Sequence, residues 1–340
     1  MKPKLLAQFP CICLVLLTIA FGGGAWADCG SVPFYAPAIV ELDVGIGSVA
    51  VPDFSFVKDV LSTASRGLTT VSFDPLQVTV FEPSQKAIVL WNGNEQILLL
   101  STDQRASQRT AVLEVIPLPS EPKVRLGSFE TFEKAQRLVV KKRMWAVAHG
   151  GAAARLLSPP PVAGRISFEK KMGAHDLSVA EVLHKNGFVE FVQNHLKSKY
   201  GTPEAPIRPE FVQMIDGYLQ DGYRWFAFDV IALDEKDSSR EPIEYRFKTD
   251  SVFYPMRIST LEEGETKVDM LVFTQRGIST FEGLSEKQFD RERTLEVDAG
   301  QVDTLAEGWR GFFGEATDLV LDQWSIEGDI GSFKSDVIVR

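Results

Sequence analysis

The chain has 340 residues, of which 44% are hydrophobic, and a formal net charge of −10 at pH 7. This length suits one large domain or two ordinary ones, and the apolar content is enough for a sizeable core. An acidic surface repels phosphate backbones, so the charge argues against nucleic acid as a partner.

Residues 1–27 have the pattern of a cleavable secretory signal peptide. Two lysines precede a mostly apolar run over residues 5–20, and an Ala-Trp-Ala cleavage site ends at Ala27. A membrane-spanning helix is the alternative, but the run is short and is interrupted by Gln8 and Pro10. We therefore expect a soluble, exported protein, periplasmic or extracellular, with no membrane anchor after cleavage.

The cysteines predict a mature fold without internal disulfides. Cys11 and Cys13 leave with the signal peptide, so the mature chain keeps only Cys29, and the loss of two lysines brings its net charge to −12. We interpret Cys29 as a tolerated thiol near a loose terminus, with intermolecular pairing or a nucleophilic role as alternatives. Lipid attachment would need a small residue before Cys29, where Asp28 stands.

Residues 28–148 are predicted to form a β-rich N-terminal lobe with one or two helices. Alternating side chains over 39–44 predict a half-buried strand. The glycines of residues 45–50 loosely match a dinucleotide-binding loop, but Pro52 falls where the phosphate-binding helix should run, so we predict a plain turn and no cofactor.

The second half of this lobe contains a predicted hairpin. Asn92-Gly93 separates apolar runs at 86–91 and 95–100, and this dipeptide favours a two-residue turn because both positions accept positive φ. A further strand is expected at 112–116, followed by a helix that begins at Ser128.

Residues 149–164, rich in Pro, Gly and Ala, are predicted to connect this lobe to a C-terminal α+β lobe over residues 165–340. Ser178 and Glu181 have the spacing of a capping box, which predicts a helix ending at Gly187. A second helix is expected over 188–200. A third begins at Pro209, and its apolar face comprises Phe211, Ile215, Tyr218 and Leu219.

The rest of the chain is predicted to be rich in strands. Apolar or alternating runs indicate strands at 223–233, 243–247, 268–274, 319–326 and 337–339, with a short helix over 302–312. The expected fold class is therefore α+β, with two strand-rich regions in antiparallel or mixed sheets and a helical segment between them.

Several of these segments resemble a known protein family. The stretches that carry the likeness are residues 81–88 (Phe-Glu-Pro-Ser-Gln-Lys-Ala-Ile), 91–93, 101–103, 114–120, 221–226 (Asp-Gly-Tyr-Arg-Trp-Phe), 245–247 and 254–255. They are similar to exported prokaryotic proteins grouped as domain of unknown function 2330, over roughly residues 29–275. The resemblance implies export and a fold, but no activity, cofactor or catalytic residue. Some similar proteins end in a membrane anchor, and we expect none in this sequence.

Candidate groups for catalysis or metal binding are sparse. The histidines are His149, His175, His184 and His195, and Glu181-x-x-His184 has the spacing of half a di-iron site. No second such pair occurs, so we predict no metal site. His149-Gly150-Gly151 resembles a lipase oxyanion loop, but no G-x-S-x-G nucleophile motif accompanies it. Hydrolysis by dispersed carboxylates stays open as an alternative.

The strand at 223–233 provides the candidate ligand surface. Tyr223 and Trp225 lie on the face opposite Phe226 and Phe228, so one aromatic pair is expected to be less buried. Core packing is the commoner role of such residues, and a surface for a protein or carbohydrate partner is the alternative. The sequence favours a non-enzymatic binding or structural protein of the cell envelope or exterior, with a secreted hydrolase as the second hypothesis.

Overall fold

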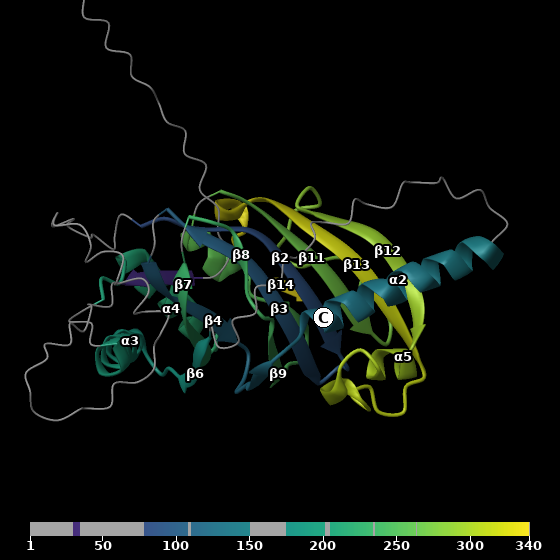
Figure 1. The fold of residues 1–340 in the computed structure, drawn as a ribbon. Helices are drawn as coiled ribbons and strands as arrows, with labels where there is room; N and C mark the ends of the chain where they lie inside the picture. The colour runs from purple at the N-terminus through teal and green to yellow at the C-terminus, as the bar shows by residue number, and fades with distance from the viewer. Residues whose placement is uncertain are drawn as a thin grey trace, which may run out of the picture.

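The computed structural model describes residues 30–34, 78–107, 110–149, 175–200, 205–233, 235–262 and 264–339 (Figure 1). The predicted signal peptide, Cys29, the strand at 39–44, the turn at 45–50 and nearly all of the connection at 149–164 lie outside these residues.

Strands and helices both occur throughout the described chain, which is α+β as expected. The strands are β1 (Gly30–Phe34), β2 (Val80–Trp91), β3 (Glu95–Ala106), β4 (Thr110–Leu118), β5 (Lys123–Leu126), β6 (Asp176–Glu181), β7 (Trp225–Leu233), β8 (Ser238–Ser239), β9 (Ile243–Lys248), β10 (Val252–Tyr254), β11 (Glu265–Thr274), β12 (Phe289–Asp298), β13 (Asp318–Asp329) and β14 (Val337–Val339). The helices are α2 (Phe129–His149), α3 (Lys185–Tyr200), α4 (Pro209–Gln220) and α5 (Ala299–Asp303), with short 3₁₀ turns η2 (Arg257–Leu261), η3 (Glu307–Trp309) and η4 (Ile330–Ser332).

The strands form two larger sheets and one small one. The first sheet has the order β1-β4-β7-β6, and the second has the order β12-β13-β11-β2-β3-β9-β5 with β8 beside β3. Every pairing is antiparallel except that of β2 with β11, which is parallel. Strands from both sides of the predicted connection at 149–164 share both larger sheets, so backbone hydrogen bonds link the predicted lobes 28–148 and 165–340.

The two larger sheets pack face to face, and helices cover their outer faces (Figure 1). On the first sheet, Phe226 and Phe228 point outward and pack against α3 and α4. On the second, the outward residues pack against α2 and the segment from α5 to Phe313. Alternate residues of each strand therefore point to the helices or to the other sheet, as the period of two requires.

The hairpin predicted around Asn92-Gly93 is confirmed, with a different turn. Asn92 N donates to Glu95 O at 3.2 Å, so the central residues are Gly93 and Asn94. Gly93 alone has positive φ, at 94°, as in type II′ turns. The Asn92 Oδ1 atom accepts hydrogen bonds from Asn94 N and Glu95 N, which holds the turn closed.

The prediction of a helix starting at Ser178 is wrong. Residues 176–181 form β6, which pairs with β7 in the register Glu181↔Trp225. The helix begins later, because His184 takes the cap position and its Nδ1 accepts a hydrogen bond from Gly187 N at 2.9 Å. Gly187 therefore lies in the first turn of α3 and does not end a helix. By contrast, α4 begins at Pro209 and buries the four predicted apolar residues.

The single helix predicted over 302–312 is also wrong. The chain forms α5 over Ala299–Asp303 and then the separate turn η3. Asp298 and Gln301 make a capping box for α5 that begins before the predicted start. The helix does not continue past η3, since Gly311 takes a φ of 69°.

Gly308→Ala is expected to lower the free energy of unfolding by about 1–2 kcal/mol. A β-carbon at this position would overlap the guanidinium of Arg125. That guanidinium donates two hydrogen bonds, each of 2.7 Å, to the buried Glu244. The measurement is urea denaturation. Gly217→Ala is the control, because its β-carbon meets nothing within 4 Å and should not destabilise α4. Unchanged stability of Gly308→Ala would refute this packing argument.

Candidate functional site

Polar side chains interrupt the core between the two larger sheets. At the positions that face the opposite sheet, β2 has Glu82, β3 has Gln104, β4 has Glu114 and β7 has Asp229. All four are buried. Two hydrophobic clusters flank them, one around Val80 and Ile231 and the other around Ala87 and Ala227, so they form a polar layer inside the sandwich.

The Gln104 amide joins two of these carboxyl groups. Its Nε2 atom donates to Oε1 of Glu82 and to Oε1 of Glu114. Arg240, whose side chain is 9% exposed, donates from Nη2 to Glu114 Oε1 at 3.1 Å. Gln85 Nε2 contacts Glu82 Oε2 at 3.4 Å. Two glutamates that lie far from each other in sequence thus share one amide and one nearby cation.

Both glutamates hold their protons more strongly than an exposed carboxyl group. Burial, and next the negative charge of Glu114, raises the pKa of Glu82 well above its ordinary value, and Arg240 only partly offsets this. Burial also raises the pKa of Glu114, while the charge of Arg240 lowers it. Like charges this close do not ionise together easily, so the pair titrates as a unit.

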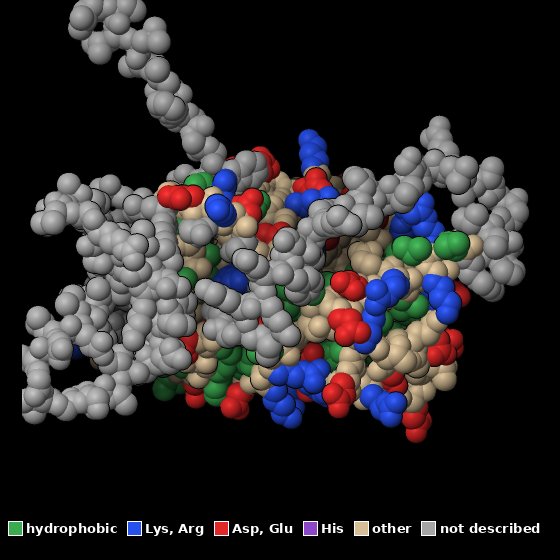
Figure 2. Space-filling model, in the orientation of Figure 1, with side chains coloured by type: hydrophobic (Ala, Val, Ile, Leu, Met, Phe, Trp, Pro, Cys, Tyr) green, Lys and Arg blue, Asp and Glu red, His purple; other side chains and the backbone are tan. Residues whose placement is uncertain are grey.

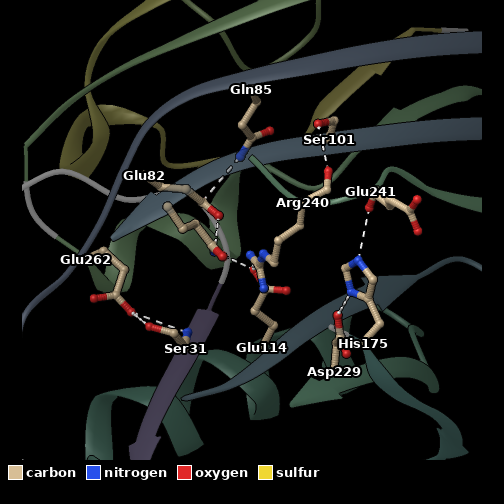
Figure 3. Close-up of polar contacts among 11 residues, drawn as sticks. Ser31, Glu82, Gln85, Ser101, Glu114, His175, Asp229, Arg240, Glu241 and Glu262 are labelled. Atoms are coloured by element: carbon tan, nitrogen blue, oxygen red, sulfur yellow. Dashed lines mark hydrogen bonds and ion pairs between the residues drawn. The ribbon is translucent and has the colours of Figure 1, made fainter. Parts of the chain in front are cut away.

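A second part of the polar layer is centred on His175, directly before β6. Its Nδ1 lies 2.5 Å from Asp229 Oδ2, and its Nε2 lies 3.0 Å from the carbonyl oxygen of Glu241 (Figure 3). Both ring nitrogens therefore face acceptors, which favours the doubly protonated, charged imidazolium. Burial lowers the pKa of His175, but the hydrogen bond and charge of Asp229 outweigh burial, so the pKa is raised overall.

The polar layer has acid–base chemistry but little space. The cavity beside it, lined in part by Glu114, His175 and Arg240, has a volume of about 20 Å³. One water molecule needs a comparable volume, whereas small-molecule sites enclose at least about 300 Å³. The described residues around this cavity can store and exchange protons, and they leave no room for an organic substrate.

A neighbouring buried carboxyl group anchors β1. Glu262 Oε1 accepts hydrogen bonds from Ser31 Oγ at 2.6 Å, from Ser31 N at 3.3 Å and from Arg208 Nη2 at 3.3 Å. Burial raises the pKa of Glu262, and the charge of Arg208 lowers it. In Figure 3, Glu262 and Ser31 lie nearer to Glu82 than to His175. This contact fastens the edge strand of the first sheet to η2.

Larger hollows lie elsewhere in the described structure. The α3–α4 groove, with a volume of about 750 Å³, is lined by Lys185, Asn186, Val189, Gln193, Ala205, Pro206, Ile207, Pro209, Val212 and Gln213. A second open groove of about 500 Å³ lies between α2 and α5. Neither includes a member of the polar layer.

The aromatic pair predicted as a ligand surface lies partly against the core. Tyr223 and Trp225 are half-buried, whereas Phe226 and Phe228 on the opposite face are fully buried. The Tyr223 ring is 5.4 Å from the ring of Phe253. Both half-buried rings pack beside the cluster between the sheets. Their role in binding stays a prediction.

The histidines predicted as potential ligands are dispersed. Glu181 ends a strand and His184 caps a helix, so the expectation that they share one helical face is wrong. His149 is the last residue of α2, and His195 stacks on Phe191 at 5.5 Å. Among the described residues, no group of three or more His, Cys, Asp or Glu could hold a metal ion.

No helix in the described parts of the chain is long and apolar enough to cross a membrane.

The polar layer was not predicted from the sequence, although a signal was present. Glu114 and Asp229 each stand within an apolar strand run, at a position that alternation directs inward.

Comparison with known proteins identifies one family. Residues 69–330 match the family described as "Uncharacterized protein conserved in bacteria (DUF2330)". No curated protein matches the chain. Among solved structures, baculovirus P35 is similar over 78% of this chain and 97% of its own, with 9% identity and a TM-score of 0.40. A mutated baculovirus P35 after caspase cleavage has 8% identity, a TM-score of 0.34 and coverage of 75% and 98%. The P35 chain match from the caspase-8/P35 complex has 9% identity and a TM-score of 0.30, and it covers 75% of this chain and 95% of that chain.

Proposed function

Because this chain belongs to the bacterial family DUF2330, whose description assigns no function, we propose one from its geometry: an exported, non-enzymatic binding protein. Its ligand is an extended polypeptide segment that lies in the α3–α4 groove. The observation that carries this proposal is that space and acid–base chemistry occur at different places in the described structure.

The α3–α4 groove has room for a ligand but lacks catalytic groups. Its described lining contains no carboxylate, imidazole, hydroxyl or thiol. The single titratable group among these described lining residues, the Lys185 ammonium, lies 3.2 Å from Asp216 Oδ2 in an ion pair. General acid–base or nucleophilic catalysis needs such groups within reach of the substrate. The groove is therefore suited to binding.

The lining also favours a polypeptide over a carbohydrate. None of the described residues that line the groove is aromatic, and sugars usually stack on aromatic rings. The lining combines apolar side chains, including Val189 and Val212, with the carboxamides of Asn186 and Gln213. Carboxamides donate and accept hydrogen bonds as peptide groups do, and apolar walls accommodate side chains.

One wall of the groove is already fixed in place. Gln193 Nε2 donates to Ala205 O at 2.7 Å, and Ala205 N donates to Gln193 Oε1 at 2.9 Å. These two bonds hold the extended residues 205–208 against α3. A fixed wall reduces the conformational entropy that binding would otherwise cost.

Export is part of the proposal and is supported by the leader pattern at residues 1–27. Sequencing the N-terminus of the protein from the cell exterior or periplasm tests it. A mature chain that begins directly after Ala27 is the expected result. Cytoplasmic protein that still begins at Met1 would refute it.

Val212→Glu is expected to weaken peptide binding at least about tenfold, since it places a charge in the apolar part of the groove. Peptides are first selected on an array with purified mature protein, and affinities are then measured by fluorescence anisotropy. Glu190→Gln is the matched control, because Glu190 is exposed on α3 outside the groove lining. If Trp225→Leu abolishes binding and Val212→Glu does not, the ligand binds at the aromatic pair and the groove is refuted.

The secreted hydrolase is the second candidate, and the proximity of Glu82, Glu114 and the His175–Asp229 pair favours it. To test this candidate, hydrolysis of ester, peptide and glycoside substrates by the mature protein is measured with and without a chelator. Turnover that Glu114→Gln abolishes in a folded protein would establish the hydrolase and overturn the binding proposal.

A further inference from the structure

The helix α2 has two parts with different surroundings. Ala135, Leu138 and Val139 are buried against the second sheet. Beyond them the helix continues to His149, and in Figure 1 its C-terminal end extends past β12. The ribbon of this outer part therefore extends beyond the edge strand of the second sheet.

A stripe of four residues runs along the solvent-facing side of this helix. Arg137, Val140, Lys141 and Met144 have the spacing i, i+3, i+4, i+7, which places them on one helical face. That face lies opposite the one formed by Ala135 and Leu138. Val140 is 51% exposed and Met144 is 68% exposed, so two large apolar side chains point into solvent.

Two basic residues of the same face, Arg137 and Lys141, flank these apolar side chains, whereas Lys142 and Arg143 are half-buried and lie off that face. Lys141, Lys142 and Arg143 are consecutive, and α2 has no acidic residue after Glu133. Figure 2 shows hydrophobic and basic side chains next to each other over the outer part of α2. The whole chain has a net charge of −10, so the positive charge of this segment is opposite in sign to that of the protein. Lys134, Arg137 and Lys141 also line the groove beside α5, together with Asp298. Lys134 and Arg137 form exposed ion pairs with Glu130 and Glu133, so the excess of positive charge lies toward the C-terminal half of the helix.

We propose that the α2 stripe docks the protein on an anionic lipid surface. The helix lies parallel to the membrane, Val140 and Met144 enter the boundary between headgroups and acyl chains, and the basic residues contact lipid phosphates. Amphipathic helices bind membranes by this combination of apolar insertion and charge attraction. The stripe is convex and has flexible side chains, which suits a deformable lipid surface better than the preformed pocket of an acidic protein.

This inference concerns a different face from the α3–α4 groove and goes beyond the proposed function. The two faces lie on separate helices, so a peptide in the groove leaves the α2 stripe available. Membrane attachment and peptide binding are then independent and can be measured separately.

Vesicle sedimentation with the mature protein tests the proposal. We expect binding to vesicles that contain phosphatidylglycerol, little binding to pure phosphatidylcholine, and a loss of binding as salt rises from about 0.1 to about 0.5 M, because salt screens the charges. Val140→Ser with Met144→Ser should reduce the partition coefficient about tenfold or more. Arg137→Gln with Lys141→Gln should cause a similar loss on anionic vesicles.

Matched controls lie elsewhere on the surface. Leu126→Ser removes a side chain that is 56% exposed on β5, and Lys248→Gln removes an exposed lysine of β9; both variants should bind vesicles as the unsubstituted protein does. Thermal melting checks that the substitutions leave the fold intact.

Two results would overturn the proposal. One is the absence of binding to anionic vesicles. The other is that the protein binds dextran sulfate as strongly as anionic vesicles and that Val140→Ser with Met144→Ser leaves vesicle binding unchanged. That result would identify an acidic polymer as the partner. Peptide binding by the serine variants reports separately on the groove.

Discussion

Arg240→Met is expected to lower the free energy of unfolding by about 4 kcal/mol at about pH 8, and by much less near pH 5. Arg240 provides the cation next to Glu114 in the polar layer, 3.1 Å away. Its removal leaves a buried carboxylate without a counter-charge, which costs more than a lost surface ion pair. Methionine fills a similar volume, so the change tests charge more than packing.

The pH dependence follows from the pKa of Glu114. Burial already raises this pKa, and removal of the Arg240 charge raises it further. A group whose folded pKa exceeds its unfolded value stabilises the fold fully below the unfolded value, and this stability is lost as pH rises through the folded value. The deficit of Arg240→Met relative to the unsubstituted protein must therefore grow as pH rises through the folded-state pKa of Glu114 in the unsubstituted protein, which lies above the ordinary value of 4.5.

Urea denaturation at the two pH values measures this difference. Adding Glu114→Gln to Arg240→Met removes both charges and should recover most of the lost stability. Arg137→Met is the control, since its 3.4 Å pair with Glu133 is exposed and contributes little. An equal loss at both pH values, or no recovery in the double variant, would show that the ion pair is not the source.

The free energy of unfolding of the unsubstituted protein is expected to fall by about 3 kcal/mol between about pH 4 and pH 8 because Asp336 ionises, and Asp336→Asn should not show this fall. Asp336 Oδ1 accepts hydrogen bonds from Tyr218 Oη at 2.8 Å and from Arg257 N at 2.9 Å. Burial raises the pKa of this carboxyl group to about 6, against hydrogen bonds and the charge of Arg257 that lower it. The amide oxygen of asparagine can accept the same two hydrogen bonds without titrating.

Stability again falls as pH rises, as expected for a carboxyl group whose pKa is raised in the folded state. The contribution of Asp336 to stability is complete below pH 3.8 and is lost as pH rises through about 6. The variant should match the unsubstituted protein near pH 4 and be more stable above pH 7, as measured by the denaturation midpoint across this range. If it is less stable by a constant amount at every pH, the carboxyl group does not titrate as stated.

The elements that were predicted well are those with local signals. The turn after β2 needs a residue that accepts positive φ, and Gly93 supplies it. The start of α4 needs a residue that tolerates a missing N–H, and Pro209 supplies it while the apolar face repeats every turn. Each of these requirements is met within a few residues of the element.

The elements that were predicted wrongly depend on partners far away in the sequence. Ser178 and Glu181 match a capping box, but β7 offers a sheet edge and residues 176–181 pair with it instead. The polar layer depends still more on tertiary structure, because Glu82, Glu114 and Arg240 meet only when the two sheets face each other. Sequence spacing does not report such a meeting, although a glutamate within the apolar run of β4 hinted at it.

The parallel contact of β2 with β11 restricts how the protein is made. Val268 pairs with Gln85 from about 180 residues further along the chain, and β2 lies between β3 and β11 in the sheet. During biosynthesis the backbone N–H and C=O groups on this edge of β2 therefore stay unpaired until the last third of the chain has emerged. A truncated chain that stops before β11 would leave that edge open to other molecules and aggregate. Late closure would also fit the export proposed above, since a chain that passes through a secretion channel must still be unfolded.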